Sequence, residues 1–124
     1  MLEELKNRIK PFYLWDYNNT ISLCLGDLTE ASDKTAFKWE IFISRTDEGF
    51  IGSGYDWLSL AQVFLAEKMP ELKGRIDFDN TSGECFCAMF TNEETLKKFA
   101  LEFRAMCDDD KLMRNLFSKA KSCG

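Results

Sequence analysis

Apolar side chains at helical spacing predict one central helix, and the rest of the chain is arranged around it. The face recurs at i, i+3, i+4, i+7 and i+8 and consists of Trp57, Leu60, Ala61, Phe64 and Leu65. Glycines at 49, 52 and 54 precede it and favour a specifically shaped loop, because glycine tolerates positive φ. Asp56 stands where its carboxylate can accept from the first free N–H groups. Pro70 cannot continue the helix, so we expect it to end near Lys68.

Alternating apolar and polar residues predict strands on both sides of this helix. Residues 12–17 and 20–25 indicate a first hairpin. Residues 37–43 alternate most clearly of all and are interpreted as a third strand. Residues 75–79 and 84–91, joined by a turn-forming connection, indicate a second hairpin.

Three further helices complete the expected order. Leu2 to Ile9 predict a short first helix that Pro11 ends. Asn92 is positioned to cap a helix, and Asp108 to Asp110 break that helix and begin the last one. The predicted fold class is α+β, with a mainly antiparallel sheet of about five strands, a central helix and two C-terminal helices packed on it. We expect residues 1–124 to form one domain.

Amino-acid composition and net charge limit which kinds of molecule the protein is expected to bind. Hydrophobic residues make up 45% of the 124 residues and aromatic residues 14%, which argues against disorder. The 21 acidic and 16 basic residues give a net charge of −5, which favours a basic protein partner over nucleic acid or an anionic membrane. The N-terminus lacks the apolar core of a secretory signal, and no apolar run is long enough to span a bilayer. We therefore expect a cytoplasmic protein that is monomeric when free.

The chain lacks most of the residues that catalysis uses. It has no histidine, which excludes Ser-His and Cys-His nucleophiles. Asp77 and Asp79 share one face of a predicted strand and could form an acid/base pair, although a solvated strand face explains them more simply. The loop Gly52-Ser53-Gly54 precedes a helix but lacks the lysine of a phosphate-binding loop, and Asp56 would repel an anion. We expect no enzyme activity and no cofactor.

The five cysteines follow no disulfide framework. An odd number without a CxxC pair is typical of reduced thiols in a cytosolic protein. Cys85 and Cys87 could begin a metal site, but no histidine is present to complete one. We therefore expect free thiols and no metal.

Two blocks of sequence resemble the immunity protein 51 family of bacterial polymorphic toxin systems. The first runs from Gly52 to Trp57 and continues through Leu60-Ala61, Phe64-Leu65 and Met69-Pro70-Glu71-Leu72. The second contains Phe78-Asp79, Gly83 and Phe86-Cys87-Ala88. The chain differs from the family pattern at Ser53, at Asn80-Thr81 and by a longer turn at Glu84. The resemblance implies an inhibitor that binds one cognate toxin without catalysis, in a system of contact-dependent growth inhibition.

A toxin directed at nucleic acid must be basic, so acidic surface groups are the candidate contacts. One group surrounds the glycine loop, a second lies at Asp27, Glu30 and Asp33, and a third is Asp108 to Asp110. The glycine loop also carries aromatic residues that we expect to be exposed, which is typical of a protein-binding patch. The predicted toxin-binding residues are Asp47, Glu48, Phe50, Tyr55 and Asp56, with a weaker group at Trp15, Asp16 and Tyr17. The alternative is a small cytosolic adaptor or ligand-binding domain without catalytic activity.

Overall fold

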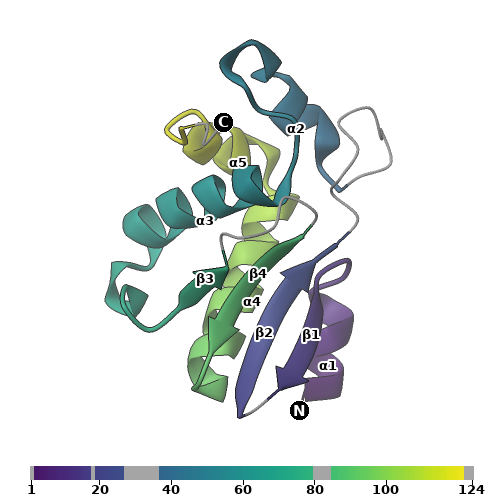
Figure 1. The fold of residues 1–124 in the computed structure, drawn as a ribbon, viewed down its shortest axis with the longest axis vertical. Helices are drawn as coiled ribbons and strands as arrows, with labels where there is room; N and C mark the ends of the chain where they lie inside the picture. The colour runs from purple at the N-terminus through teal and green to yellow at the C-terminus, as the bar shows by residue number, and fades with distance from the viewer. Residues whose placement is uncertain (1, 18, 27–36, 80–84, 122–124) are drawn as a thin grey trace.

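The computed structural model describes residues 2–17, 19–26, 37–79 and 85–121. Pairs of strands and groups of helices follow one another along the chain (Figure 1). The elements are α1 (Leu2–Arg8), β1 (Tyr13–Tyr17), β2 (Thr20–Leu25), α2 (Trp39–Ile43), the 3₁₀ turn η1 (Thr46–Glu48), α3 (Gly54–Lys68), the 3₁₀ turn η2 (Pro70–Leu72), β3 (Asp77–Asp79), β4 (Phe86–Phe90), α4 (Glu93–Asp108) and α5 (Asp110–Phe117). The α+β class is confirmed, as are both predicted hairpins.

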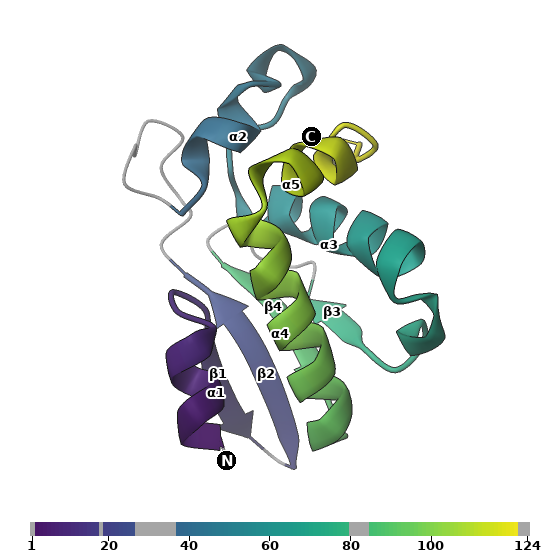
Figure 2. The ribbon, with the colours of Figure 1, turned by 180° about the vertical axis from the view of Figure 1, so that it is seen from behind.

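Four strands in the described part of the chain form one antiparallel sheet in the order β1-β2-β4-β3. The register places Leu23 opposite Ala88 and Leu25 opposite Phe86. All four side chains are buried and face the core. Figure 2 shows α1 and α4 lying across this face of the sheet, and Figure 1 shows the sheet from its other side, where none of the labelled helices crosses it. The helices therefore cover one face of the sheet.

The predicted third strand at residues 37–43 is wrong, because Trp39–Ile43 forms the short helix α2. Lys38 adopts a left-handed conformation at φ 58°, which ends any extended run. Ile41 and Phe42 are then both fully buried, whereas a strand would direct neighbouring side chains to opposite faces. Phe42 lies 4.9 Å from Trp57 and 5.0 Å from Phe117 between ring centroids. Packing against α3 and α5 overrides the strand preference, and the sheet has four strands instead of five.

Trp57 lies at the centre of the core, as its place in the helical pattern predicted. Its ring is fully buried and lies 5.7 Å from Phe12 and 6.1 Å from Phe103 between centroids. Phe64 and Phe99, also predicted as core, are buried and contact each other at 5.8 Å. These rings join the central helix to the N-terminal strand region and to α4.

The predicted helix boundaries depend on polar caps that the structure contains. The side chain of Asn92 accepts from the N–H of Thr95 at the start of α4. Asp109 accepts from the N–H of Leu112 at 3.1 Å and begins α5, so the break at the aspartate run is confirmed. The helix α3 ends at Lys68, and its C-cap Met69 directly precedes Pro70.

Candidate protein-binding site

Asp56 organises the glycine loop from inside. The loop leads into α3, where Ser53 is the N-cap residue and Asp56 completes a capping box. The carboxylate Oδ2 accepts from the backbone N–H groups of Ile51 at 2.7 Å, Gly52 at 2.7 Å and Ser53 at 3.2 Å. Asp56 is only 3% exposed. It therefore stabilises the loop and is not available for direct contact with a partner.

Two glycines give the loop its path. Gly49 has φ 98° and Gly52 has φ 85°, conformations that L-residues rarely adopt. A Cβ at Gly52 would lie at an ordinary contact distance of 3.8 Å from Phe42, so the backbone conformation is what favours glycine there. The shaped loop predicted from the glycine spacing is therefore confirmed at these two positions.

The side chain of Arg45 connects η1 to α5 by hydrogen bonds. Its Nε and Nη2 donate to the two carboxylate oxygens of Glu48, each at 2.8 Å, and its Nη1 donates to the carbonyl of Phe117. The guanidinium also lies over the rings of Phe50 and Phe117, at 4.6 Å and 4.9 Å from their centroids. The hydrogen bond from Arg45 lowers the pKa of the Glu48 carboxyl below its usual value. One side chain thus holds the end of η1 against α5.

The expectation that Phe50 is an exposed aromatic residue is wrong. Its ring is 0% exposed and lies 4.7 Å from Phe117 between centroids. Burial under Arg45 explains this, since the loop folds back on α5 instead of projecting into solvent. The loop presents a different apolar residue, Ile51, which is 42% exposed. Sequence reasoning missed Ile51 because no periodicity distinguishes loop residues that point outward.

The exposed residues of this region form what we call the loop surface: Asp47, Glu48, Ile51 and Tyr55. Tyr55 is 37% exposed in the first turn of α3. Asp47 and Glu48 are exposed on η1, and Glu48 is held in place by Arg45. Acidic and apolar side chains are therefore exposed on one short segment, whose backbone is held by internal hydrogen bonds.

The second predicted group lies on β1, away from the loop surface (Figure 1). Trp15 is 60% exposed, and Asp16 is exposed beside it. The side chain of Tyr17 lies outside the described residues. Tyr13, which sequence reasoning did not select, is 44% exposed and stands two residues before Trp15. The period of two along a strand could have identified it as a neighbour on the same face.

The two other acidic groups predicted as candidate contacts can be described to different extents. Asp27, Glu30 and Asp33 lie outside the described residues. Asp108 pairs with Arg104 at 2.6 Å and Asp110 with Arg114 at 2.9 Å. Together with the cap at Asp109, these contacts give the aspartate run a local structural role in α4 and α5.

The cysteines include one close group on the sheet. The Sγ atoms of Cys24 and Cys87 lie 3.3 Å apart, and those of Cys85 and Cys87 lie 3.7 Å apart. Burial raises the pKa of the Cys87 thiol, and its hydrogen bond with Cys24 adds to this shift. None of the four described cysteines is part of a disulfide. Within the described ranges, no group of three or more His, Cys, Asp or Glu residues is arranged to hold a metal ion.

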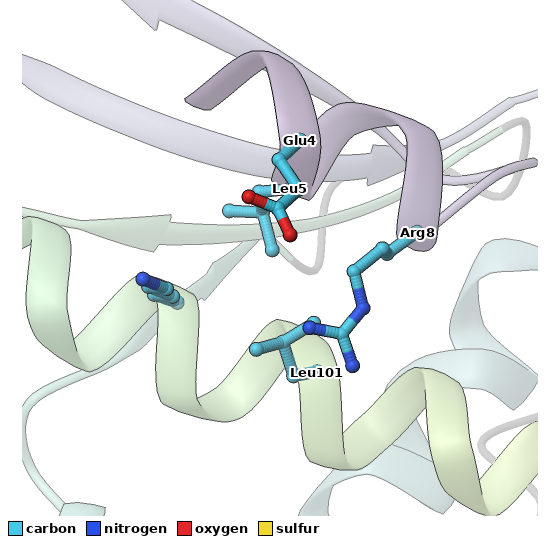
Figure 3. Close-up of a pocket in the computed structure, with 5 residues that line it drawn as sticks. Glu4, Leu5, Arg8 and Leu101 are labelled. Atoms are coloured by element: carbon cyan, nitrogen blue, oxygen red, sulfur yellow. The ribbon is translucent and has the colours of Figure 1, made fainter. Parts of the chain in front are cut away.

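A small cavity between α1 and α4 offers little to a ligand. It measures about 70 Å³ and is lined by Glu4, Leu5, Arg8, Lys97 and Leu101. Figure 3 shows Glu4 and Arg8 reaching from α1 towards Leu101 of α4. Pockets for small molecules are several times larger, on the order of 300–1,000 Å³. No described helix is long and apolar enough to cross a membrane.

Comparison with known protein families decides the class of the chain. A family model described as Immunity protein 51 matches residues 12–122. The chain belongs to the immunity protein 51 family. The match covers the described elements from β1 to α5, and it confirms the resemblance carried by the two sequence blocks. No curated protein and no solved structure matches the chain.

Membership of the immunity protein 51 family supports a role as an immunity protein and implies a cognate toxin as the partner. Immunity proteins of this kind are generally non-catalytic. The functional question is therefore which surface recognises the toxin.

Proposed function

We propose that this protein neutralises a basic, nucleic-acid-directed toxin in the bacterial cytoplasm by binding it without catalysis, and that the loop surface is the centre of this contact. The observation that carries the proposal is the loop surface itself, in a chain of the immunity protein 51 family. It contains four exposed residues that are close together in the sequence: Asp47, Glu48, Ile51 and Tyr55.

Hydrogen bonds within the protein lower the entropic cost of binding a partner at the loop surface. Arg45 and Asp56 hold the backbone on both sides of Ile51, so little conformational entropy remains to be lost when a partner binds. Tyr55 can contribute a large ring at a small entropic cost, with a hydroxyl available for hydrogen bonding. A small apolar centre rimmed by charge is the usual composition of a protein interface.

The negative net charge of the chain supports a basic protein as the partner. The chain carries a net charge of −5, and a toxin that binds nucleic acid needs lysine and arginine on its surface. Opposite charges accelerate association by electrostatic steering. Asp47 and Glu48 are then expected to act mainly on the association rate, while Tyr55 and Ile51 act on dissociation.

The test uses the cognate toxin domain, which we expect to be encoded directly upstream of this gene. Replacing Asp47 with Asn and Glu48 with Gln together should slow association and flatten its dependence on salt. Tyr55→Ala should speed dissociation by about tenfold or more, as expected for a hot-spot residue. The matched control is Glu94→Gln with Glu102→Gln, which removes the same charge from exposed positions on α4.

Thermal unfolding of each variant separates binding from folding. The proposal requires that the loop-surface variants lose affinity while remaining folded at the temperature of the binding assay, since Glu48→Gln also weakens the pair with Arg45. Full affinity in a stable variant changed at Asp47, Glu48, Ile51 and Tyr55 would place the contact elsewhere.

A further inference from the structure

The face of the sheet opposite α1 and α4 carries two rows of residues across all four strands (Figure 1). Alternation along β4 separates the faces, since Phe86, Ala88 and Phe90 are buried towards the helices while Cys87 and Met89 are half-buried on the other side. The register gives one row as Trp15, Ser22, Met89 and Asp77, and the other as Tyr13, Cys24, Cys87 and Asp79. We call this surface the open sheet face.

The chemistry of the open sheet face changes from one edge to the other. The β1 edge is aromatic, with Trp15 60% and Tyr13 44% exposed. The middle strands present small or soft residues, of which Ser22, Cys87 and Met89 are half-buried and Cys24 is buried. The β3 edge is acidic at Asp77, which is exposed at the end of the first row. Neither row contains a lysine or an arginine.

The dimensions of this face match one helix. Neighbouring strands lie about 4.8 Å apart, so β1 and β3 are separated by roughly 14 Å. An α-helix with its side chains is about 10–12 Å across. A helix lying along β2 and β4 would set its apolar side on Ser22 and Met89, with aromatic rings on one flank and the carboxylate of Asp77 on the other.

We propose that the open sheet face binds one basic amphipathic helix of the cognate toxin, as a second contact separate from the loop surface. This inference rests on the proposed function, since it concerns the same partner. A lysine or arginine on one flank of the helix pairs with Asp77, and a cationic or apolar side chain on the other flank packs on Trp15.

The charge of the face selects this occupant over two others. Nucleic acid would be repelled by a surface whose rows carry only negative charge. A second copy of this chain would bring the same aspartates and another net charge of −5 to the interface. A basic helix is the partner that satisfies both the aromatic and the acidic edge.

The experiment titrates the upstream-encoded toxin domain into the purified protein. Trp15→Ala should weaken binding by about tenfold or more, and Asp77→Lys should weaken it by a similar factor through charge reversal. The control Glu102→Lys makes the same charge change on α4, on the opposite side of the sheet, and should bind like the wild type. Asp77→Asn serves as the milder variant if Asp77→Lys lowers the melting temperature.

Fluorescence gives a second readout that does not depend on variant stability. Trp15 is the most exposed tryptophan, whereas Trp57 is fully buried and Trp39 half-buried. Toxin binding should shift the emission to shorter wavelength and protect it from acrylamide, and Trp15→Phe should abolish most of this change.

The outcomes separate the two proposals. If the wild type neither binds the toxin nor protects cells, the proposed function fails. If the wild type binds and protects while Trp15→Ala and Asp77→Lys do so equally well and Trp15 stays quenchable, only the open-sheet-face contact is overturned. Protection of Trp15 with increasing protein concentration alone, together with a dimer in sedimentation, would assign the face to a second copy and also overturn it.

Discussion

Replacing Asp56 with alanine should destabilise the fold far more than removing an ordinary helix cap. In the wild type, one buried carboxylate oxygen accepts three backbone N–H groups at 2.7, 2.7 and 3.2 Å. A hydrogen bond to a charged group contributes about 1.5–3 kcal/mol net. Counting the two short bonds fully and the long one as a small addition, we expect a loss of about 3–6 kcal/mol.

The measurement is equilibrium unfolding in urea, followed by tryptophan fluorescence, to which the buried Trp57 contributes together with Trp15 and Trp39. The matched control is Asp109→Ala, which removes an exposed cap that accepts one N–H at 3.1 Å. Loss of such a cap costs about 1 kcal/mol. Since domains are stable by only about 5–15 kcal/mol, Asp56→Ala should move the midpoint strongly while Asp109→Ala moves it slightly.

Comparing Asp56→Ala with Asp109→Ala can refute the role assigned to the Asp56 carboxylate. If Asp56→Ala lowers the free energy of unfolding no more than Asp109→Ala, the carboxylate does not hold the loop as described. Asp56→Asn provides an intermediate point, because it retains one acceptor oxygen without the charge and should fall between the wild type and the alanine variant.

The remaining predictions concern other parts of the molecule. Arg45→Lys should destabilise by about 1–2 kcal/mol in thermal unfolding, because lysine cannot keep both the bidentate pair and the ring faces, and an unchanged melting temperature would contradict this. Burial raises the pKa of the Cys107 thiol to about 12. Stability should therefore be complete below the unfolded value of about 8.5 and fall as pH rises above it, and Cys107→Ala should reduce that fall. Thiol titration after unfolding should count five thiols, and a chelator should leave the melting temperature unchanged, whereas a missing pair or a shift would reveal a disulfide or a metal. The purified protein should not turn over RNA, DNA or nucleotides, and activity lost in Asp77→Asn with Asp79→Asn would refute this.

The fold was predictable where the sequence signal is local. Caps such as Asn92 and the helix stop at Pro70 act within one turn, so residue type and spacing were sufficient. The error at residues 37–43 arose because a short apolar run suits a strand or a buried helix equally well. Contacts from α3 and α5, distant in sequence, decided between them.

The candidate site was predictable only in part, because contacts between residues far apart in the sequence decide which of its side chains are exposed. The glycine loop and Tyr55 stand where the pattern placed them, with Tyr55 at the surface. The burial of Phe50 depends on Arg45 and on Phe117, which is 67 residues further along the chain, so no local pattern contains it. The same holds for the open sheet face, whose rows exist only once β1, β2, β4 and β3 are paired.

Helices on one side of the sheet also affect how this protein can change through evolution. The exposed edge positions Trp15 and Asp77 lie outside the hydrophobic core, which is built by the opposite side of the same strands. Surface substitutions of this kind usually change stability by less than about 0.5 kcal/mol. New side chains can therefore be sampled there at little risk to folding, while Leu23, Ala88 and Phe86 stay constrained by packing. Such an arrangement allows specificity to diverge rapidly in response to a changing partner while the scaffold is preserved.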